Sequence, residues 1–434
     1  MKRDPQALQD REHDVLVIGG GIAGAWVVWE AASRGLKAAL IEIEDFGQST
    51  SWSSMKTAHG GLRHLQRLDL RGFRESVRER RALLRVAPEI VRPLRFAIAA
   101  NGVFDQARLF LGGLANDVLS FDRNEGLRPD RSIGFARTMG ADEAESLGLG
   151  DLTHEGAFVW HDAQITHTER LLFGLLHAAT EASALIVNHC RIESGVLKPA
   201  GFEVEATDSV TGRGLLVRAR SIVNASGAGI EAVSRSFGQT CGSPPFIRGV
   251  NVVLGCARTP SLALGARAEG RFLFLVPWLG RSILGTWYDG GERPVEALVR
   301  DLLGGGRRAF PWLELKADGV QAVHAGHVPA RRGEPIYRSR LIFHADPRMI
   351  SILTAKYTTA RATAESAIDR VGQALSVSLP PSVTARTLLT RATPLPGTLA
   401  ERLRLVEETE MALSPAEAMR GRLLEGAFGE TALP

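Results

Sequence analysis

Apolar and polar positions at the start of the chain predict alternating strands and helices. Residues 14–44 begin with an apolar run, pass through a glycine-rich turn, continue as an apolar segment of helical length and end in a second apolar run followed by acids. Short apolar runs without alternation are typical of parallel strands that are covered on both faces. The pattern therefore predicts a β-α-β unit.

Helical periodicity returns at several later points. Apolar residues recur at roughly helical spacing over residues 68–91, with arginines on the opposite face, and similar patterns lie at 168–182 and 294–310. From residue 351 a strand, a turn and a long helix are expected, as in a nucleotide-binding layer. Residues 96–155 mix patterns between glycines and prolines, which indicates an inserted region.

Alternating apolar and polar positions predict antiparallel strands in the middle of the chain. Residues 186–227 are expected to form a β-meander with turns at 198–201 and 209–214, ending on a buried strand. Residues 247–254 and 271–288 have further strand patterns, which predict a second sheet. The chain thus combines an α/β layer with antiparallel sheets.

Composition places the chain among ordinary globular proteins. Of its 434 residues, 44% are hydrophobic and 23% are charged, and this length predicts two domains rather than one. The net charge of +4 does not by itself indicate nucleic-acid binding. The three cysteines lack CxxC spacing, which argues against a disulfide framework or a zinc site and favours a reducing, cytoplasmic location. Glycines interrupt the first apolar run, which argues against a signal peptide or a membrane span.

The glycine turn has the spacing of a dinucleotide-binding fingerprint. Gly19 permits the turn, Gly21 lets a pyrophosphate approach the backbone, and Gly24 lets the helix pack closely on the strand. Glu42 ends the second strand, where a carboxylate can accept both ribose hydroxyls of an adenosine. A 2′-phosphate would be repelled there, so NADP is disfavoured. FAD and NAD remain open, because both carry the same adenosine diphosphate half.

The segment after this unit resembles a flavin-facing loop. Residues 45–65, DFGQSTSWSSMKTAHGGLRHL, are similar to that loop in the FAD-dependent glycerol-3-phosphate dehydrogenases, members of the D-amino-acid-oxidase superfamily. Similar motifs follow, including IVNASGAG at 222–229, FLVPWLGRSILGTWYD at 274–289 and KYTTAR at 356–361. The resemblance covers about residues 13–373 and favours FAD over NAD.

The resemblance implies an α/β fold. A Rossmann-like FAD-binding domain of the GR2/DAO type is expected to be interleaved with an α+β substrate domain, and a short helical C-terminal cap is expected to follow. The expected segments are 13–95, 156–235 and 320–375 for the FAD-binding domain, 96–155 and 236–319 for the substrate domain, and 376–434 for the shortened cap.

The resemblance also implies which residues hold FAD, which we expect to be bound non-covalently. Backbone amides of the glycine-rich loop are expected to lie against the edge of the flavin ring. Lys56 and its serine neighbours are expected near the phosphates and the ribityl chain. The expected cofactor-binding residues are Gly19, Gly21, Gly24, Glu42, Ser53, Ser54, Lys56, His59, Gly60, Gly61, Ala225, Gly227, Lys356 and Thr358.

The implied reaction is hydride transfer to flavin N5 from a C–H bond that bears a hydroxyl group, while a base takes the hydroxyl proton. The expected substrate is small and anionic: glycerol 3-phosphate or a related phosphorylated alcohol. Arg63 and Arg340 would orient its anionic group, and Lys356 would stabilise the negative charge of reduced flavin. His327 is a candidate base. The electron acceptor is left open among a quinone, oxygen and a partner protein.

Four departures from the family pattern lie on the substrate side or at the flavin edge. Asn251 stands in a segment that in the family ends in a histidine, and the motif around His327 replaces one that carries an arginine. His64 stands for an aromatic residue with a hydroxyl group, and Thr354-Ala355 for two glycines. The other candidate replacements for the lost base and charge are His324, Arg331 and Arg332, followed by His161 and Tyr288.

These departures keep other functions open. An amino-acid or amine oxidase-like activity is the alternative within the superfamily, because an arginine beside flavin suits a carboxylate as well as a phosphate. A non-catalytic flavin-binding protein is the alternative outside enzymes. Nucleic-acid binding is not expected, because the arginines of residues 67–85 alternate with glutamates, as on a salt-bridged surface helix. Membrane association is doubtful, and the expected location is cytoplasmic, with peripheral contact to a membrane left open.

Overall fold

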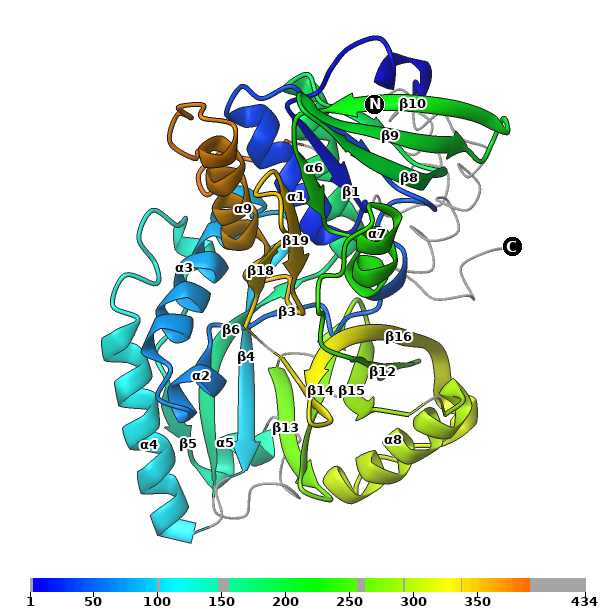
Figure 1. Cartoon of the computed structure of the whole chain (residues 1–434). Helices are drawn as coiled ribbons and strands as arrows, with labels where there is room; N and C mark the ends of the chain where they lie inside the picture. Colours follow the sequence, from blue (N-terminus) through cyan, green and yellow to red (C-terminus); the bar gives the residue numbers. More distant parts are fainter. Residues whose placement is uncertain are drawn as a thin grey trace, which may run out of the picture.

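The structure, a computed structural model, has two halves that the chain enters several times (Figure 1). One half is built on a parallel sheet near the N-terminus, and the other on a larger, mostly antiparallel sheet. The residues that the structure describes are 3–99, 102–146, 156–255, 262–291, 293–336 and 338–390.

A six-stranded sheet forms the core of the first half. In spatial order its strands are β18 (Arg340–Phe343), β19 (Met349–Leu353), β11 (Ile222–Asn224), β1 (Val15–Ile18), β2 (Ala38–Ile41) and β7 (Leu185–Val187). All pairs are parallel except β18 with β19 at one edge. Both β1 and β2 are buried along their whole length, which explains their continuous apolar sequences.

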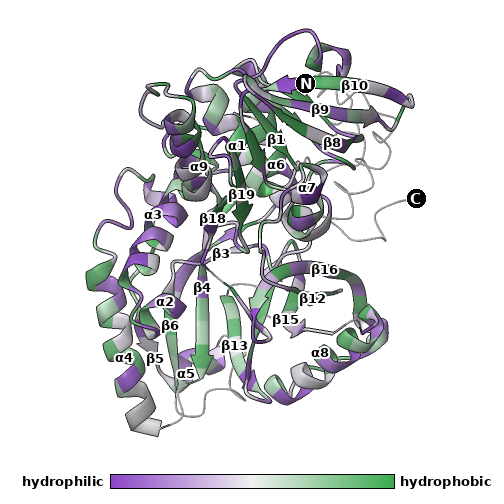
Figure 2. Ribbon diagram, in the orientation of Figure 1, coloured by the Kyte–Doolittle hydropathy of each residue, from purple (hydrophilic) through white to green (hydrophobic). Residues whose placement is uncertain are grey.

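Helices and a small sheet cover the two faces of this six-stranded sheet. On one face α1 (Ile22–Ser33) packs against both α6 (Thr168–Glu181) and α9 (Ala360–Ala374). On the other lies the predicted meander of β8 (Cys190–Lys198), β9 (Gly201–Asp208) and β10 (Arg213–Ala219). Figure 2 shows hydrophobic residues concentrated along β1 and its neighbours between these layers. The predicted β-α-β unit and Rossmann-like layer are confirmed.

A ten-stranded sheet forms the core of the second half. Its strands in spatial order are β17 (Glu334–Pro335), β16 (Val320–Arg331), β12 (Phe246–Leu254), β15 (Arg281–Asp289), β14 (Arg271–Trp278), β13 (Leu262–Ala268), β4 (Val91–Ala99), β6 (Ala157–Ile165) and β3 (Thr57–Ala58), with β5 (Arg137–Met139) paired to β6. α8 (Val295–Ala309) packs on β12, β13, β14 and β15. Its apolar residues, such as Leu298 and Leu302, face the sheet.

The remaining helices lie beside the second sheet or between the halves (Figure 1). They are α2 (Leu62–Gln66), α3 (Leu70–Val86), α4 (Gly102–Leu119), α5 (Ala141–Ser146) and α7 (Ile230–Ser236). Sequence patterns predict α3 but not α4. Phe110, Leu111, Leu114 and Val118 of α4 are exposed, so its apolar residues do not mark a single buried face.

The division of strands between the sheets differs from the predicted segments. β4 and β6 fall partly or wholly within the segments expected for the FAD-binding domain, and β16 begins the third, yet all three pair in the second sheet. A strand pattern shows that a strand forms but not which sheet it joins. Of the expected cap, residues 376–390 form turns and irregular structure, and residues 391–434 lie outside the described part. In the described part, no helix is long and apolar enough to cross a membrane.

Candidate functional site

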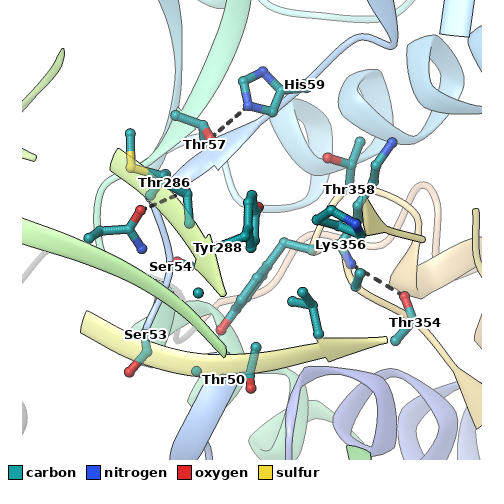
Figure 3. A pocket seen from close by; sticks show the side chains of 18 of the residues that line it. Thr50, Ser53, Ser54, Thr57, His59, Thr286, Tyr288, Thr354, Lys356 and Thr358 are labelled. Carbon is teal, nitrogen blue, oxygen red and sulfur yellow. Dashed lines mark hydrogen bonds between the residues drawn. The ribbon is translucent and has the colours of Figure 1, made fainter. Parts of the chain in front are cut away.

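A large cavity lies between the two halves, with a volume of about 2360 Å³. Its wall includes the glycine turn before α1, the end of β2, the loop that leads to α2, strands of the second sheet and the segment before α9. Figure 3 shows side chains from the loop that leads to α2, from β15 of the second sheet and from the segment before α9 around the cavity. Pockets for one drug-sized ligand have about 300–1,000 Å³. The cavity therefore has room for an extended ligand and for a small second one.

The glycine turn forms one end of this cavity. Gly19 has a φ of +108°, and a Cβ there would lie 2.7 Å from the carbonyl oxygen of Ala225. A Cβ on Gly24 would lie 1.8 Å from the carbonyl oxygen of Gly19, so only glycine lets α1 pack this closely. Gly21 is the N-cap residue of α1, has no side-chain cap and lines the cavity. The positive end of the helix dipole thus faces the space where an anionic group can bind.

Glu42 lies beside the turn at the end of β2. Its carboxylate accepts hydrogen bonds from the backbone N–H groups of Gly20 and Glu44, the second at 2.8 Å. Burial raises the pKa of Glu42 despite these bonds. Ala225 and Gly227, in the turn after β11, line the same end of the cavity. A glycine turn, a helix N-terminus and a carboxylate therefore meet at one place, which fits the pyrophosphate and ribose of an adenosine diphosphate group.

The loop before α2 forms the long side of the cavity. Ser53, Ser54, His59, Gly61 and Arg63 all line it. The φ of Gly61 is +91°, and a Cβ there would lie 2.8 Å from the Cβ of a serine on α3, so glycine is required at this start of α2.

Gly60 packs against β6 and α3 and does not line the cavity. Its N–H donates to Oδ1 of Asp162 at 2.5 Å, and a Cβ on Gly60 would lie 2.1 Å from Nη1 of Arg80. Gly60 therefore lies outside the cavity wall, because the loop turns its backbone toward α3 and β6 at this point, and its contact with the cofactor stays a prediction. Gly24 likewise acts in packing, as predicted.

The partly exposed His59 pairs with the buried Asp162 on the wall of the cavity. Nδ1 of His59 lies 3.0 Å from Oδ2 of Asp162, and Nη1 of Arg80 donates to Oδ1 at 2.7 Å. Burial raises the pKa of Asp162, but the hydrogen bond and charge of His59 and the charge of Arg80 outweigh this effect and hold the pKa below its usual value. Asp162 is therefore a carboxylate, and His59 donates from Nδ1. Nε2 of His59 lies 3.1 Å from the hydroxyl oxygen of Thr57 (Figure 3).

Lys356, His64 and Asp69 form a chain of hydrogen bonds on the cavity wall. Nζ of Lys356 lies 2.9 Å from Nε2 of His64, and Nδ1 of His64 lies 2.9 Å from Oδ2 of Asp69. Burial and then the charge of Arg63 lower the pKa of Lys356 to about 8. Sequence reasoning predicts Lys356 here but misses Asp69. The sequence does offer a way to find Asp69, because an aspartate directly before a helix is a typical N-cap residue. Asp69 stands directly before α3 and accepts a hydrogen bond from the N–H of Gly72.

The second sheet supplies the opposite wall. Asn251 and Tyr288 line the cavity, and Oδ1 of the buried Asn251 accepts a hydrogen bond from the hydroxyl of Thr286 at 2.6 Å (Figure 3). His327 also lines the cavity, and its backbone N–H and C=O both bond to the hydroxyl of Thr50. Burial, with a smaller effect of a nearby arginine, lowers the pKa of His327. The two hydrogen bonds between His327 and Thr50 hold strand β16 against the loop that leads to α2.

Lys56 does not reach the cavity, in contrast to the expectation from the loop motif. It is fully buried, and Nζ donates to Oε1 of Glu169 at 2.7 Å, to Oγ1 of Thr168 at 2.7 Å and to the carbonyl oxygen of Trp52 at 2.9 Å. Burial lowers its pKa, while Glu169 opposes that effect. Glu169 lies far from Lys56 in the sequence, so the motif could not reveal this partner. Lys56 anchors the loop on α6.

Several other candidates also lie away from the cavity. Arg340 is exposed at the start of β18 and does not line it. His324 is buried between tryptophan rings, and burial lowers its pKa to about 3. Arg361, in the KYTTAR motif, forms a buried ion pair with Glu79 of α3 at 2.6 Å. The remaining candidates that do not line the cavity are Arg331, Arg332 and His161.

Thr354, Ala355 and Thr358 line the cavity next to Lys356. The hydroxyl groups of Thr354 and Ser339 lie 2.7 Å apart, so Thr354 is held by the neighbouring segment. The two side chains that replace a glycine pair are therefore accommodated within the wall of the cavity. Thr358 lies at the expected position, on the turn before α9 (Figure 3).

Comparison with known proteins agrees with this geometry. The family model of FAD dependent oxidoreductases (DAO) matches residues 14–363. The chain is 30% identical to a glycerol-3-phosphate dehydrogenase of Synechocystis sp. over an alignment of 448 positions, gaps included, that covers 95% of this chain and 77% of that protein.

Solved structures show the same fold. The glycerol-3-phosphate dehydrogenase from Bacillus halodurans, complexed with FAD, is 22% identical and has a TM-score of 0.68, covering 99% of this chain and 78% of that one. A glycine oxidase from Geobacillus kaustophilus is 19% identical with a TM-score of 0.58, covering 87% of this chain and 98% of that one. The predicted resemblance and cofactor are confirmed: the chain belongs to the DAO family of FAD-dependent oxidoreductases.

Proposed function

We propose that the enzyme oxidises the hydroxyl-bearing carbon of a small phosphorylated alcohol, glycerol 3-phosphate or a close relative. The observation that carries this proposal is a pair of cations on the cavity wall. Arg63 and Lys356 both line the cavity, and they lie close enough for Arg63 to lower the pKa of Lys356. Two positive charges suit a phosphate dianion better than a singly charged carboxylate. The names of the relatives support the same substrate.

Residues at different places along the cavity wall would hold different parts of FAD. The N-terminus of α1 would hold the pyrophosphate and Glu42 the ribose. The loop residues Ser53 and Ser54, together with Thr358, would lie along the ribityl chain and the flavin. Lys56 contributes indirectly, because its ion pair with α6 fixes the loop. When bound, FAD supplies the group that accepts the hydride.

Arg63 and Lys356 would act on the substrate side of the cofactor. The guanidinium of Arg63 would hold the phosphate group and so orient the carbon that loses hydride. Lys356 would keep a positive charge beside the reacting atoms, where it stabilises negative charge that develops during the reaction. Arg340, on the exposed edge strand, has no part in this arrangement. Asn251 on the opposite wall lacks a group that can take a proton at neutral pH, so it would position rather than deprotonate the substrate.

Oxidation of an amino acid or amine is the second candidate. Asn251 favours it, because a neutral amine has no hydroxyl proton that a histidine at this position would have to remove. A carboxylate would then take the place of the phosphate at Arg63. The glycine oxidase with the same fold shows only that this fold accommodates such substrates.

An anaerobic substrate screen separates these functions. The FAD-loaded protein is mixed with glycerol 3-phosphate, other phosphorylated alcohols, glycine and larger amino acids, and bleaching of the flavin absorbance is followed. The proposal predicts bleaching by a phosphorylated alcohol. Bleaching only by an amino acid selects the second candidate, and no bleaching by any donor selects a non-catalytic flavin-binding protein.

A further inference from the structure

We propose that the substrate carries an apolar chain beside the carbon that is oxidised, an inference that deepens the proposed function and rests on it. The substrate class would be a phosphorylated alcohol with such a chain, for example an alkyl ether of glycerol phosphate. The observation behind it is a row of residues across the floor of the cavity that has no polar side-chain atom. This apolar row consists of Phe274 on β14, Gly265 on β13, Ile98 on β4 and Phe158 on β6, all of which line the cavity.

The apolar row begins near Asn251, on the substrate side of the cavity. Asn251 lies opposite Gly285 on β15, and Gly285 in turn lies opposite Phe274. The rest of the row follows in the same register, one residue on each successive strand. Residues opposite one another on neighbouring strands point to the same face of the sheet. Because strands lie about 4.8 Å apart, the row starts about 10 Å from Asn251 and ends about 24 Å from it.

The loop that carries Arg63 reaches the same floor. Leu62, directly before Arg63, packs against the apolar cluster that contains Phe158. The ring of His59 lies 6.2 Å from the ring of Phe274. A substrate whose phosphate is bound by Arg63 can therefore extend its other end over the apolar row.

Helix α4 faces the far part of the row across open space. Leu109, Gly112 and Ala115 recur at helical spacing on α4, and all three line the cavity. A Cβ on Gly112 would meet nothing within 4 Å, whereas a Cβ on Gly113 would lie 2.7 Å from Cε2 of Phe158. The helix is thus packed against the end of the row at Gly113, and Gly112 faces unfilled space.

The surfaces around this space are apolar and only partly covered. Ile98, Leu109 and Phe274 are half-buried, and all three pack against the same apolar cluster. The nearby arginines that line the cavity, Arg108 beside Leu109 and Arg267 two residues after Gly265, are exposed. An apolar ligand group that covers the half-buried side chains gains about fourfold in affinity for each methylene that it buries.

The apolar chain takes no part in the chemical step. The C–H bond of the hydroxyl-bearing carbon breaks and its electron pair leaves with the hydride to FAD, the hydroxyl proton passes to solvent, and the carbon–oxygen bond becomes a carbonyl. Glycerol 3-phosphate can undergo the same reaction, but it leaves the apolar row uncovered. The chain therefore acts on affinity, and glycerol 3-phosphate should be the weaker of the two substrates.

A comparison of glycerol 3-phosphate with 1-O-hexylglycerol 3-phosphate tests the inference. The ether keeps the phosphate and the central hydroxyl group, and both compounds are mixed anaerobically with the FAD-loaded enzyme. The ether should reach half of its maximal rate of flavin reduction at a concentration at least about tenfold lower, because burial of two methylenes alone gives about fifteenfold. An equal or higher half-maximal concentration for the ether would overturn the inference, as would bleaching by glycerol 3-phosphate alone.

Gly112→Leu should remove this preference by filling the space above the row. Leucine favours a helix more than glycine does, so the variant should fold. The preference for the ether should fall below about threefold, and Ala115→Leu, on the same side of α4, should lower it as well. Gly214→Leu, at an exposed glycine of β10 outside the cavity wall, should keep the full preference. An unchanged preference in both filling variants would overturn the inference, and so would loss of FAD from folded Gly112→Leu, which would place the flavin over the row.

Binding of alkyl phosphates gives a readout without catalysis. Hexyl phosphate and methyl phosphate lack a secondary alcohol, and calorimetric titration of the FAD-loaded protein measures their affinities. Hexyl phosphate should bind at one site and at least about tenfold more tightly than methyl phosphate, and Gly112→Leu should reduce this difference. Equal affinities in the natural protein, or an undiminished difference in Gly112→Leu, would contradict the inference. Failure of the proposed function is distinguishable, because neither glycerol 3-phosphate nor its ether would then bleach the flavin, whatever the affinities of the alkyl phosphates.

Discussion

The two ends of the cavity are built in different ways. At the end next to α1 the wall is mostly backbone: glycines let the chain turn and pack, and the helix N-terminus faces the cavity. At the other end the wall is mostly side chains from different segments, with Arg63 and His64 on α2, Asn251 on β12 and Lys356 before α9. A site formed by backbone requires glycines that are close together in the sequence, so a short motif identifies it. A site formed by side chains from distant segments can change its residues while the fold around it stays the same.

The largest expected effect is at the backbone end. Gly21→Val should abolish FAD binding, because the new side chain would project near Ser51, 2.9 Å from a Cβ at this position, and occupy the space of the pyrophosphate. The measurement is the ratio of flavin to protein absorbance after purification, with circular dichroism to confirm folding. Gly214→Val on the exposed face of β10, where a Cβ meets nothing within 4 Å, is the control and should stay yellow. Full FAD occupancy in Gly21→Val would refute the assigned cofactor site.

Lys356→Met should show the next largest effect, on rate and not on colour. Removal of one group that stabilises developing charge at the reacting atoms costs about 10²–10³-fold in typical enzymes. The variant should retain FAD, and its anaerobic rate of flavin reduction at pH 7, where most of Lys356 is protonated, should fall by about that factor. Lys316→Met, at an exposed lysine that does not line the cavity, is the control. A loss below tenfold would remove Lys356 from the proposed chemistry.

Arg63→Ala should weaken binding of the substrate by about 10–100-fold and leave the protein yellow. The estimate corresponds to about 1.5–3 kcal/mol for a charge-assisted hydrogen bond. The concentration dependence of flavin reduction gives the apparent affinity. Arg71→Ala, at an exposed arginine of α3 outside the cavity wall, should bind as the natural enzyme does. Loss of FAD in Arg63→Ala would instead place this arginine on the cofactor side.

Asn251→Ala should have the smallest effect of this series. An amide cannot act as a base at neutral pH, so the variant should lose less than about tenfold in the rate of flavin reduction, mainly through the unpaired hydroxyl of Thr286. The same anaerobic assay measures it. A loss of a hundredfold or more would show that the substrate end depends on Asn251 directly, and the contrast between the two ends would then fail.

The sequence predicts the backbone end well for a physical reason. The roles of Gly19 and Gly24 follow from chain geometry, which depends on residues close in sequence. The position of Lys56 does not, because its charge is satisfied by Glu169, on a helix that comes more than a hundred residues later. The motif identifies the loop but not the direction in which this side chain points.

The same limit applies to the substrate end and to the second sheet. The partnership of His64 with Lys356 joins residues 292 positions apart, and no local pattern indicates it. Asp69 could be predicted as a helix cap but not as the hydrogen-bond partner of His64. β16 is not among the predicted strands, and its pairing with β12 in the second sheet depends on contacts between distant segments. Local elements are therefore predictable here, and side-chain partnerships across the cavity are not.

The most direct test of the central claim is the isotope effect on flavin bleaching. Glycerol 3-phosphate that carries deuterium on its hydroxyl-bearing carbon is mixed anaerobically with the FAD-loaded enzyme, alongside the unlabelled compound. Both compounds should bleach the flavin, and the deuterated substrate should do so several-fold more slowly, because the C–H bond breaks as hydride leaves. Absence of bleaching by both compounds, together with bleaching by an amino acid, would contradict the account.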